Sequence, residues 1–429
     1  MTNSPLRVCH LGKYYPPAPG GMESHLQTLA RAQASLGAEV DVVCVNHMDR
    51  HGKNLTWSRH GATDTLRETD GPVRLTRVGR SASFARLDVC PQLNNILRSL
   101  DRADIDILHV HTPNPTMLLA LSAVRPDIPT VITHHSDIVR QRILRYALRP
   151  FEQMVYRRAT TVFATSPAYL SRSNLLKRFA SKVRSLPLGV GLQDYLTPSA
   201  AAHAHAEQLK REHGPLLWLA VGRCVYYKNF HVAIRALTHV PGKLIIVGHG
   251  PEENALKLLA KELGVSDRVI WRNYAPKDEL VGAYLAAKAL FFPSNARSEA
   301  FGLVQVEAMA SGCPVINTQI DGSGVPWVSP HHVTGLTVPI DDAHAFADAA
   351  NRLHQDPELR DRLSKAARLR AVEEFDHIRM GERSLSAYQA ALSKQQRKAR
   401  MTTRNVRPQP AAGALSAEAE AVDEQGMFA

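Results

Sequence analysis

The chain has 429 residues, of which 44% are hydrophobic and 21% are charged, and this length and composition fit a globular protein with two domains. We find no N-terminal signal peptide and no apolar run of membrane-spanning length, so no membrane-spanning helix is predicted. The net charge of +12 favours an anionic partner such as a nucleotide, an acidic lipid surface or a nucleic acid.

The cysteines are scattered along the chain with neither paired spacing nor the spacing of metal ligands. Several lie within apolar runs that read as strands, so we expect buried free thiols in a reducing cytosol. The five are Cys9, Cys44, Cys90, Cys224 and Cys313.

The N-terminal half begins with a predicted β-α-β unit. An apolar strand over residues 6–11 leads through a loop rich in proline and glycine into a helix, and a second strand follows over residues 40–45. Gly20 and Gly21 lie in the loop, at the carboxyl end of the first strand, where open α/β sheets place ligands. Both a plain turn and a ligand loop fit these glycines. The pattern is not G-x-G-x-x-G, which argues against a nicotinamide enzyme.

Four histidines lie at or near the ends of two further predicted strands, over residues 105–111 and 130–133. They are His109, His111, His134 and His135. Imidazole is a common metal ligand, so a metal cluster is one interpretation. No carboxylate or cysteine occurs at a matching spacing, however, and we predict no metal. Residues 47–80 are weakly periodic and predict loops around a strand near residues 73–75.

The segment 138–158 is basic, with six arginines against Glu152 alone, and it carries an apolar stripe. Pro150 predicts a break or a new helix start there. A basic amphipathic segment can lie on an anionic membrane surface. A helix packed on the core with a solvated basic face fits the pattern equally well.

The C-terminal half repeats the β-α order and predicts a second parallel α/β domain. The composition changes between Asp194 and Gly214, where apolar periodicity is weak, and we place the interdomain linker there. A strand over residues 216–221 then ends in a loop that carries Arg223 and Lys228. Two cations five residues apart suit a diphosphate that lies between them. A pair of surface cations is the alternative.

A second loop-to-helix junction follows the buried strand at residues 289–292. The helix is predicted to begin near Gly302 and to stop at Gly312, and the free amides of Phe301, Gly302 and Leu303 at its start would suit a phosphate. Glu299 precedes this helix and Glu307 lies about two turns along it. The helical rise between them is roughly 12 Å, about the length of a sugar–diphosphate–ribose ligand. A capped surface helix with a solvated Glu307 is the alternative.

Together these motifs, in this order, resemble family 4 of the retaining GT-B glycosyltransferases, and the resemblance covers most of residues 6–390. It implies an α/β protein with the GT-B fold, in which two Rossmann-like parallel-sheet domains face each other across a cleft. The expected divisions are an acceptor-side domain over 1–194, a domain for the nucleotide sugar over 195–376, a helix over 377–393 that crosses back to the first domain, and a disordered tail over 394–429.

The resemblance also implies roles for the residues above, without any metal or cofactor. His135 and Glu299 would act at the transferred sugar, and Glu307 would bind the ribose. Since His134 stands where an aromatic residue is usual, the resemblance leaves open which of the two adjacent histidines acts. His111 matches a second recurrent histidine of the family. The expected contacts to the diphosphate come from Gly20, Gly21, Arg223, Lys228, Phe301, Gly302 and Leu303.

Three short segments look most like bacterial mannosyltransferases (rhamnosyl/mannosyltransferase type) of surface-polysaccharide assembly: 134–138, 226–228 and 323–327. This implies transfer of a hexose, mannose from GDP-mannose, to a lipid-linked saccharide, in the cytoplasm at the inner face of the plasma membrane. The alternatives are a GT-B sugar-nucleotide epimerase and a basic module that binds nucleic acid or a membrane. The arginines lack interleaved aromatic residues, so we expect no nucleic acid.

Overall fold

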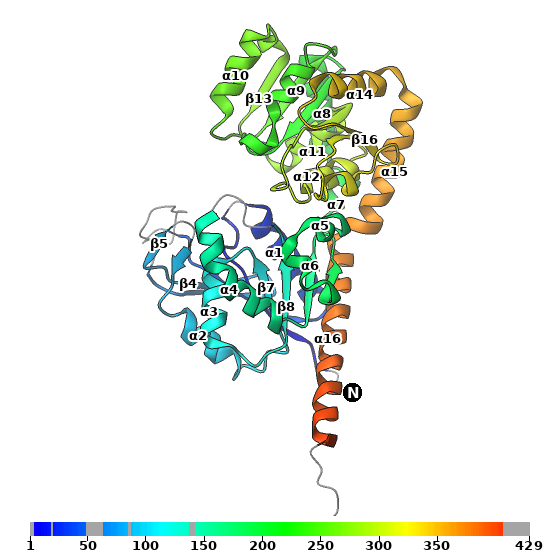
Figure 1. Ribbon diagram of the computed structural model, residues 1–429. Helices are drawn as coiled ribbons and strands as arrows, with labels where there is room; N and C mark the ends of the chain where they lie inside the picture. Colours follow the sequence, from blue (N-terminus) through cyan, green and yellow to red (C-terminus); the bar gives the residue numbers. More distant parts are fainter. Residues whose placement is uncertain (1–3, 19, 49–62, 85–86, 137–141, 406–429) are drawn as a thin grey trace, which may run out of the picture.

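The computed structural model describes residues 4–18, 20–48, 63–84, 87–136 and 142–405, with side chains placed up to Lys394 except over 142–145. The described chain forms two α/β domains, each built on its own sheet, with the first domain below the second in Figure 1. None of the helices in these ranges is both long enough and apolar enough to span a lipid bilayer.

The N-terminal sheet has the strand order β10-β9-β8-β7-β1-β2-β4-β3, parallel except for β3. Its strands are β1 (Arg7–Leu11), β2 (Glu39–Val45), β3 (Leu66–Asp70), β4 (Val73–Val78), β7 (Ile107–Thr112), β8 (Thr130–His134), β9 (Thr161–Ala164) and β10 (Val183–Ser185); β5 (Ala82–Phe84) and β6 (Leu87–Val89) form a separate hairpin. The longer helices of this domain are α1 (Gly21–Ser35), α2 (Leu93–Leu100), α3 (Pro115–Val124), α4 (Arg142–Arg158) and α5 (Pro167–Arg172), with α6 (Asn174–Lys177) a single turn.

The C-terminal sheet has the order β13-β12-β11-β14-β15-β16 and is parallel throughout. Its strands are β11 (Leu217–Val221), β12 (Lys243–Val247), β13 (Val269–Arg272), β14 (Ala289–Phe292), β15 (Val315–Thr318) and β16 (Gly335–Val338). The helices are α7 (Gln193–Leu196), α8 (Ala200–His213), α9 (Phe230–Ala236), α10 (Glu253–Glu262), α11 (Lys277–Ala286), α12 (Leu303–Ala310), α13 (Val325–Val328), α14 (Ala343–Gln355) and α15 (Pro357–Phe375). In sequence order this is the 3-2-1-4-5-6 arrangement, whose direction switches between β11 and β14.

Alternation along the strands sends side chains to two separate cores, one on each face of the C-terminal sheet. On β11, Leu217, Leu219 and Val221 join the core under α8, α11 and α12, whereas Trp218 and Ala220 join the core under α9 and α14. Both faces are therefore covered, which is why β11 reads in the sequence as an unbroken apolar run.

The last helix, α16 (His377–Asn405), leaves the second domain and packs along one side of the first, and its far end projects beyond that domain in Figure 1. Met380 and Tyr388 share a core with Val8, Ile107 and Val131 of the N-terminal sheet. The predicted helix stopped at residue 393, but α16 continues to Asn405, because residues 394–405 contain good helix formers and no glycine or proline. Residues 406–429 of the predicted tail lie outside the described residues.

Three local predictions differ from the structure. Most of the predicted linker is α8, which buries Ala202, Ala206 and Leu209 at helical spacing against the domain core. Pro150 lies inside α4 rather than at a break. The region 47–80 contains a β3–β4 hairpin, and its two-residue Gly71-Pro72 turn is a sequence signal that the prediction missed.

The two domains touch through α5 and the loops that follow β14 and β15. Arg172 forms an ion pair with Asp321, with 2.9 Å between Nη2 and Oδ2, and the guanidinium of Arg297 lies 5.2 Å from the ring centre of Tyr169. A Cβ on Gly324 would come within 2.9 Å of the Ser166 hydroxyl oxygen. These contacts bring the carboxyl end of β9 close to that of β14.

Candidate active site

One of the two predicted cations, Lys228, and one of the two predicted glutamates, Glu299, meet at the switch point of the C-terminal sheet. Lys228 ends the loop after β11 and Glu299 lies in the loop after β14; their Nζ and Oε2 atoms are 2.7 Å apart, and each side chain is only about one-tenth exposed. The Lys228 ammonium also lies 4.8 Å from the ring centre of Phe292. Since ligands of open α/β sheets bind at the carboxyl edge where the strand order switches, this ion pair occupies the expected ligand position.

Close backbone packing holds the Lys228 loop in place. A side chain at Gly248, after β12, would overlap the carbonyl oxygen of Gly222, so the two loops can approach only through a glycine. The backbone N–H of Asn295 donates to the backbone carbonyl of Tyr227 at 3.0 Å. The side chains of Asn229 and Asn295 both donate to Asp341 Oδ1, at 2.8 and 2.9 Å. The loops after β11, β14 and β16 are thus tied together.

The helix predicted to bind a phosphate begins as expected. Gly302 precedes α12 with φ of +79°, and a Cβ there would lie 2.6 Å from Phe292 Cζ, so both the conformation and the space require glycine. Phe301 is buried in the domain core, which fixes the direction of the turn. Leu303 is the first residue of α12, and its amide therefore has no partner within the helix.

Glu307 is not a solvated surface residue, so that alternative is wrong. Its Oε2 atom accepts a hydrogen bond from the Tyr284 hydroxyl at 2.9 Å, and Tyr195 also hydrogen-bonds the carboxylate. Burial raises the pKa of Glu307 above its usual value, although both phenol hydrogen bonds oppose that rise. Neither tyrosine was predicted, because they come from α7 and α11, more than 20 residues from Glu307, and no local pattern links them to it.

Arg223, Gly20 and Gly21 are exposed. Gly20 directly precedes α1 and Gly21 is its first residue, at the carboxyl edge of the N-terminal sheet. The side chain of Arg223 has no hydrogen bond or ion pair with another described residue, so its guanidinium is available to a ligand.

The histidines of the N-terminal sheet gather between that sheet and helices α1 and α16. His10 on β1 pairs in register with His109 on β7. His111 Nε2 lies 3.0 Å from His10 Nδ1, and His111 Nδ1 lies 3.2 Å from His135 Nε2. Burial, reinforced by the neighbouring imidazoles, lowers the pKa of both His111 and His135 well below the usual range, so both rings are neutral at physiological pH. His25 of α1 completes the group, with its ring centre 4.9 Å from that of His135.

The adjacent histidines His134 and His135 point to opposite faces of the sheet. His134 Nδ1 lies 2.7 Å from the Tyr156 hydroxyl of α4, and its ring packs 5.8 Å from that of Tyr169. His135 lies on the other face, beside His111 and His25, and is 9% exposed. The two side chains therefore have different surroundings: His134 packs against α4 and α5, and His135 belongs to the histidine group.

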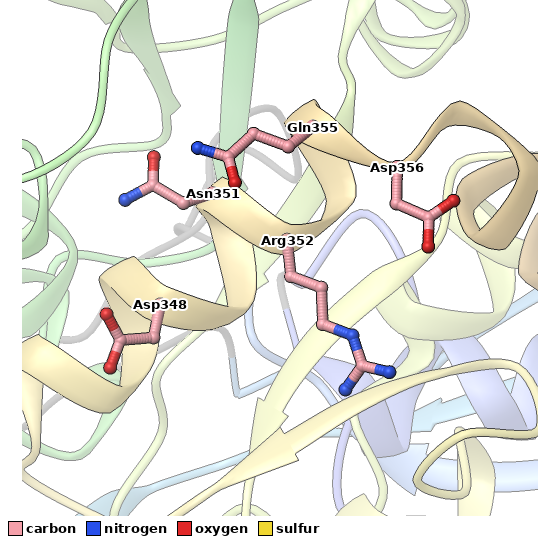
Figure 2. A pocket seen from close by; sticks show the side chains of 5 residues that line it. All are labelled: Asp348, Asn351, Arg352, Gln355 and Asp356. Atoms are coloured by element: carbon pink, nitrogen blue, oxygen red, sulfur yellow. The ribbon is translucent and has the colours of Figure 1, made fainter.

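A surface pocket elsewhere on the second domain is unrelated to this site. Figure 2 shows the side chains that line it, all from α14 and the residue after it: Asp348, Asn351, Arg352, Gln355 and Asp356. Since α14 starts at the carboxyl edge of the sheet, beyond β16, and runs back along it, these residues lie toward the opposite edge from Lys228 and Glu299.

The fold and the site define a glycosyltransferase of the GT-B class. Among solved structures, sucrose-phosphate synthase from Thermosynechococcus elongatus superimposes with a TM-score of 0.72 over 91% of this chain and 100% of its own, at 23% identity. Residues 203–370 match the family model described as glycosyl transferases group 1, and residues 19–194 match that of glycosyltransferase family 4.

Curated relatives cover nearly the whole chain. The O-antigen chain mannosyltransferase C of Escherichia coli is 29% identical, over 87% of this chain and 96% of its own. A D-inositol 3-phosphate glycosyltransferase of Frankia alni is 30% identical, over 87% of this chain and 95% of its own. The chain therefore belongs to glycosyltransferase family 4.

Proposed function

We propose that this glycosyltransferase transfers mannose, with retention of configuration, from GDP-mannose to a lipid-linked saccharide in surface-polysaccharide assembly. The observation that carries the proposal is the Lys228–Glu299 ion pair beside the start of α12, because it places a cation, a carboxylate and free amides at one ligand position. The similarity to an O-antigen mannosyltransferase supports the choice of sugar and pathway.

In the proposed complex the donor diphosphate takes the place of Glu299 as the partner of Lys228. Arg223, which is exposed, and the amide of Leu303 at the start of α12 add further positive charge. All three stabilise the charge that develops on the departing nucleotide diphosphate, and this electrostatic contribution is the main one the site can make. No metal is needed for it.

The carboxylates hold the two ends of the donor. Glu307, oriented by Tyr284 and Tyr195, accepts hydrogen bonds from the ribose hydroxyls. Glu299, once released by Lys228, and His135 hold the hydroxyls of the sugar as it becomes oxocarbenium-like. No enzyme nucleophile is assigned, so the acceptor attacks the face that the diphosphate leaves.

A membrane contact would suit a lipid-linked acceptor. On α4, Tyr146 is 71% exposed and Phe151 is 38% exposed, and Arg149, Arg157 and Arg158 are exposed beside them. Aromatic and basic side chains on one helix are typical of a contact with an anionic bilayer surface. We therefore place the enzyme on the cytoplasmic side of the membrane, in keeping with its five free cysteines.

A donor panel tests the proposal. Thermal unfolding with GDP-, UDP- and ADP-sugars should show the largest stabilisation with GDP-mannose, because a ligand that binds only the folded state raises the melting temperature. With a polyprenyl-diphosphate-linked saccharide as acceptor, NMR of the product should show an α-linked mannose, and EDTA should leave the rate unchanged. Isomerisation of the donor in the absence of acceptor would instead identify an epimerase.

A further inference from the structure

The histidine group contains two sets of three whose ring nitrogens lie within 4.8 Å of one another. One set is His10, His109 and His111, and the other is His25, His111 and His135. All five rings are buried, with His135 at 9% the most exposed. A metal ion needs a nitrogen lone pair from each ligand, so the existing hydrogen bonds decide which set can bind one.

In the first set every ring nitrogen already has a hydrogen-bond partner. His109 Nδ1 is bonded to the Tyr388 hydroxyl of α16, and its Nε2 lies 2.7 Å from Thr133 Oγ1. His10 Nε2 lies 2.7 Å from Gln33 Oε1, and its Nδ1 is taken by His111. Every ring nitrogen of His10 and His109 therefore already has a partner.

The same hydrogen bonds fix the protonation of His111. Gln33 Nε2 donates to Ser384 Oγ and to the Tyr388 hydroxyl, at 2.8 and 2.9 Å, so Gln33 presents only its oxygen to His10. His10 must then donate from Nε2 and accept at Nδ1. His111 in turn donates from Nε2, which leaves the lone pair of its Nδ1 directed at His135.

The second set differs from the first through His25. Its side chain is 1% exposed, and neither of its ring nitrogens has a hydrogen-bond partner within the described parts of the chain. A buried polar group without a partner is costly and rare, and a role in ligand binding is one explanation for it. The ring centres of His111 and His135 are 5.6 and 4.9 Å from that of His25 and 5.5 Å from each other, so the three rings form a triangle.

We propose that His25, His111 and His135 form a binding site for a divalent transition-metal ion such as Zn²⁺, and that the bound ion inhibits glycosyl transfer. Around tetrahedral zinc the ligand nitrogens lie about 3.3 Å apart, and the Nδ1 of His111 and the Nε2 of His135 are already 3.2 Å apart. The ligand nitrogen of His25 lies within 4.8 Å of those of the other two histidines, so it must move by at most about 1.5 Å to reach the tetrahedral separation. The hydrogen bond from His111 to His10 orients the central ligand, as is usual for metal-bound histidines.

The inhibition follows from the ring chemistry of His135 and rests on its proposed role at the sugar. Without metal, His135 Nε2 donates its hydrogen to His111 and Nδ1 can accept one from a sugar hydroxyl. When the ion binds Nε2, the proton moves to Nδ1 and the imidazole stays neutral. Nδ1 then donates a hydrogen bond instead of accepting one, and the metal-bound ring is held in place, so it can no longer accept a hydrogen bond from the sugar hydroxyl.

Co²⁺ titration of the full-length protein tests the site without reference to activity, since tetrahedral Co²⁺ with nitrogen ligands absorbs visible light. We expect one ion per chain with that spectrum. His25→Leu, which removes an unpartnered buried polar group, should weaken binding at least 100-fold; His25→Gln is the second choice if the leucine variant does not fold. His109→Gln, in the same group but outside the proposed ligands, should bind Co²⁺ within ten-fold of the wild type.

Two further measurements separate the parts of the proposal. Anomalous scattering from crystals soaked in Zn²⁺ should place the ion between the three imidazoles. An ion found only at surface histidines would overturn the proposed site. Unchanged Co²⁺ binding in both His25 variants would overturn it as well. Zn²⁺ should inhibit transfer by the wild type, reversibly with EDTA, but not transfer by His25→Leu. Binding without inhibition would refute the effect on His135 while leaving the site and the transferase assignment intact.

Discussion

Replacement of Lys228 by methionine tests whether this residue has more than a structural role. The substitution keeps the length of the side chain and removes its charge, so Glu299 loses the cation 2.7 Å away while remaining only 12% exposed. Breaking a buried ion pair costs about 3–5 kcal/mol. Because Glu299 retains some solvent contact, we expect about 2–3 kcal/mol here, which lowers the melting temperature of the second domain by about 4–12 °C.

Activity should respond differently from stability. If Lys228 stabilises the departing diphosphate, its loss removes about 2.7–4 kcal/mol of transition-state stabilisation and lowers kcat about 10²–10³-fold. In the double variant Lys228→Met/Glu299→Gln no charge is left unpaired, so most of the stability should return. Turnover should not return, since the cation is still missing. Denaturation by urea and initial-rate kinetics with saturating donor measure the two effects separately.

Lys257 provides a matched control. It forms an ion pair with Glu253 at the same distance, 2.7 Å, but its side chain is 47% exposed on the surface of α10. Lys257→Met should therefore change stability by less than about 1 kcal/mol and leave kcat unaltered. A folded Lys228→Met variant that keeps kcat within ten-fold of the wild type would refute the role of Lys228 at the diphosphate, and so would a double variant that regains turnover together with stability.

Three further predictions address the other residues of the site. Glu307→Gln should raise donor KM about 10–100-fold, through the loss of charged hydrogen bonds to the ribose, and an unchanged KM would refute the ribose role. Since burial raises the folded-state pKa of Glu307, the wild type loses stability as the pH rises through that pKa. Urea denaturation should therefore show that the stability of Glu307→Gln relative to the wild type is greater at pH 8 than at pH 5. His135→Asn should lower kcat at least 100-fold. His134→Asn should keep most activity and lower the free energy of unfolding by about 1 kcal/mol, through loss of the hydrogen bond to Tyr156. The reverse result in the same assays would make His134, and not His135, the histidine that acts at the sugar. Gly302→Ala should lower stability by more than 1 kcal/mol and weaken thermal stabilisation by donor, because alanine strains the positive φ and meets Phe292, and wild-type behaviour in both would contradict the tight turn.

The loops after the strands could be predicted because their signals are local. Apolar strands followed by glycine, proline and charged residues identify the carboxyl edge of each sheet, and that edge is where Lys228, Glu299 and the start of α12 lie. The β3–β4 hairpin was equally local, but only a strand near residues 73–75 was predicted, and β3 and the turn were overlooked. Pro150 shows the limit of such rules, because α4 continues through it.

The sequence by itself determined the two parallel-sheet domains, the order of their elements and the residues at the ligand edge, since each depends on neighbours within a few positions. Only the tertiary structure decided which side chains meet across those elements. Tyr284 reaches Glu307 from α11, and Gln33 of α1 and Tyr388 of α16 fix the histidines because α16 returns to the first domain. Such contacts depend on the packing of distant helices, for which no short pattern exists.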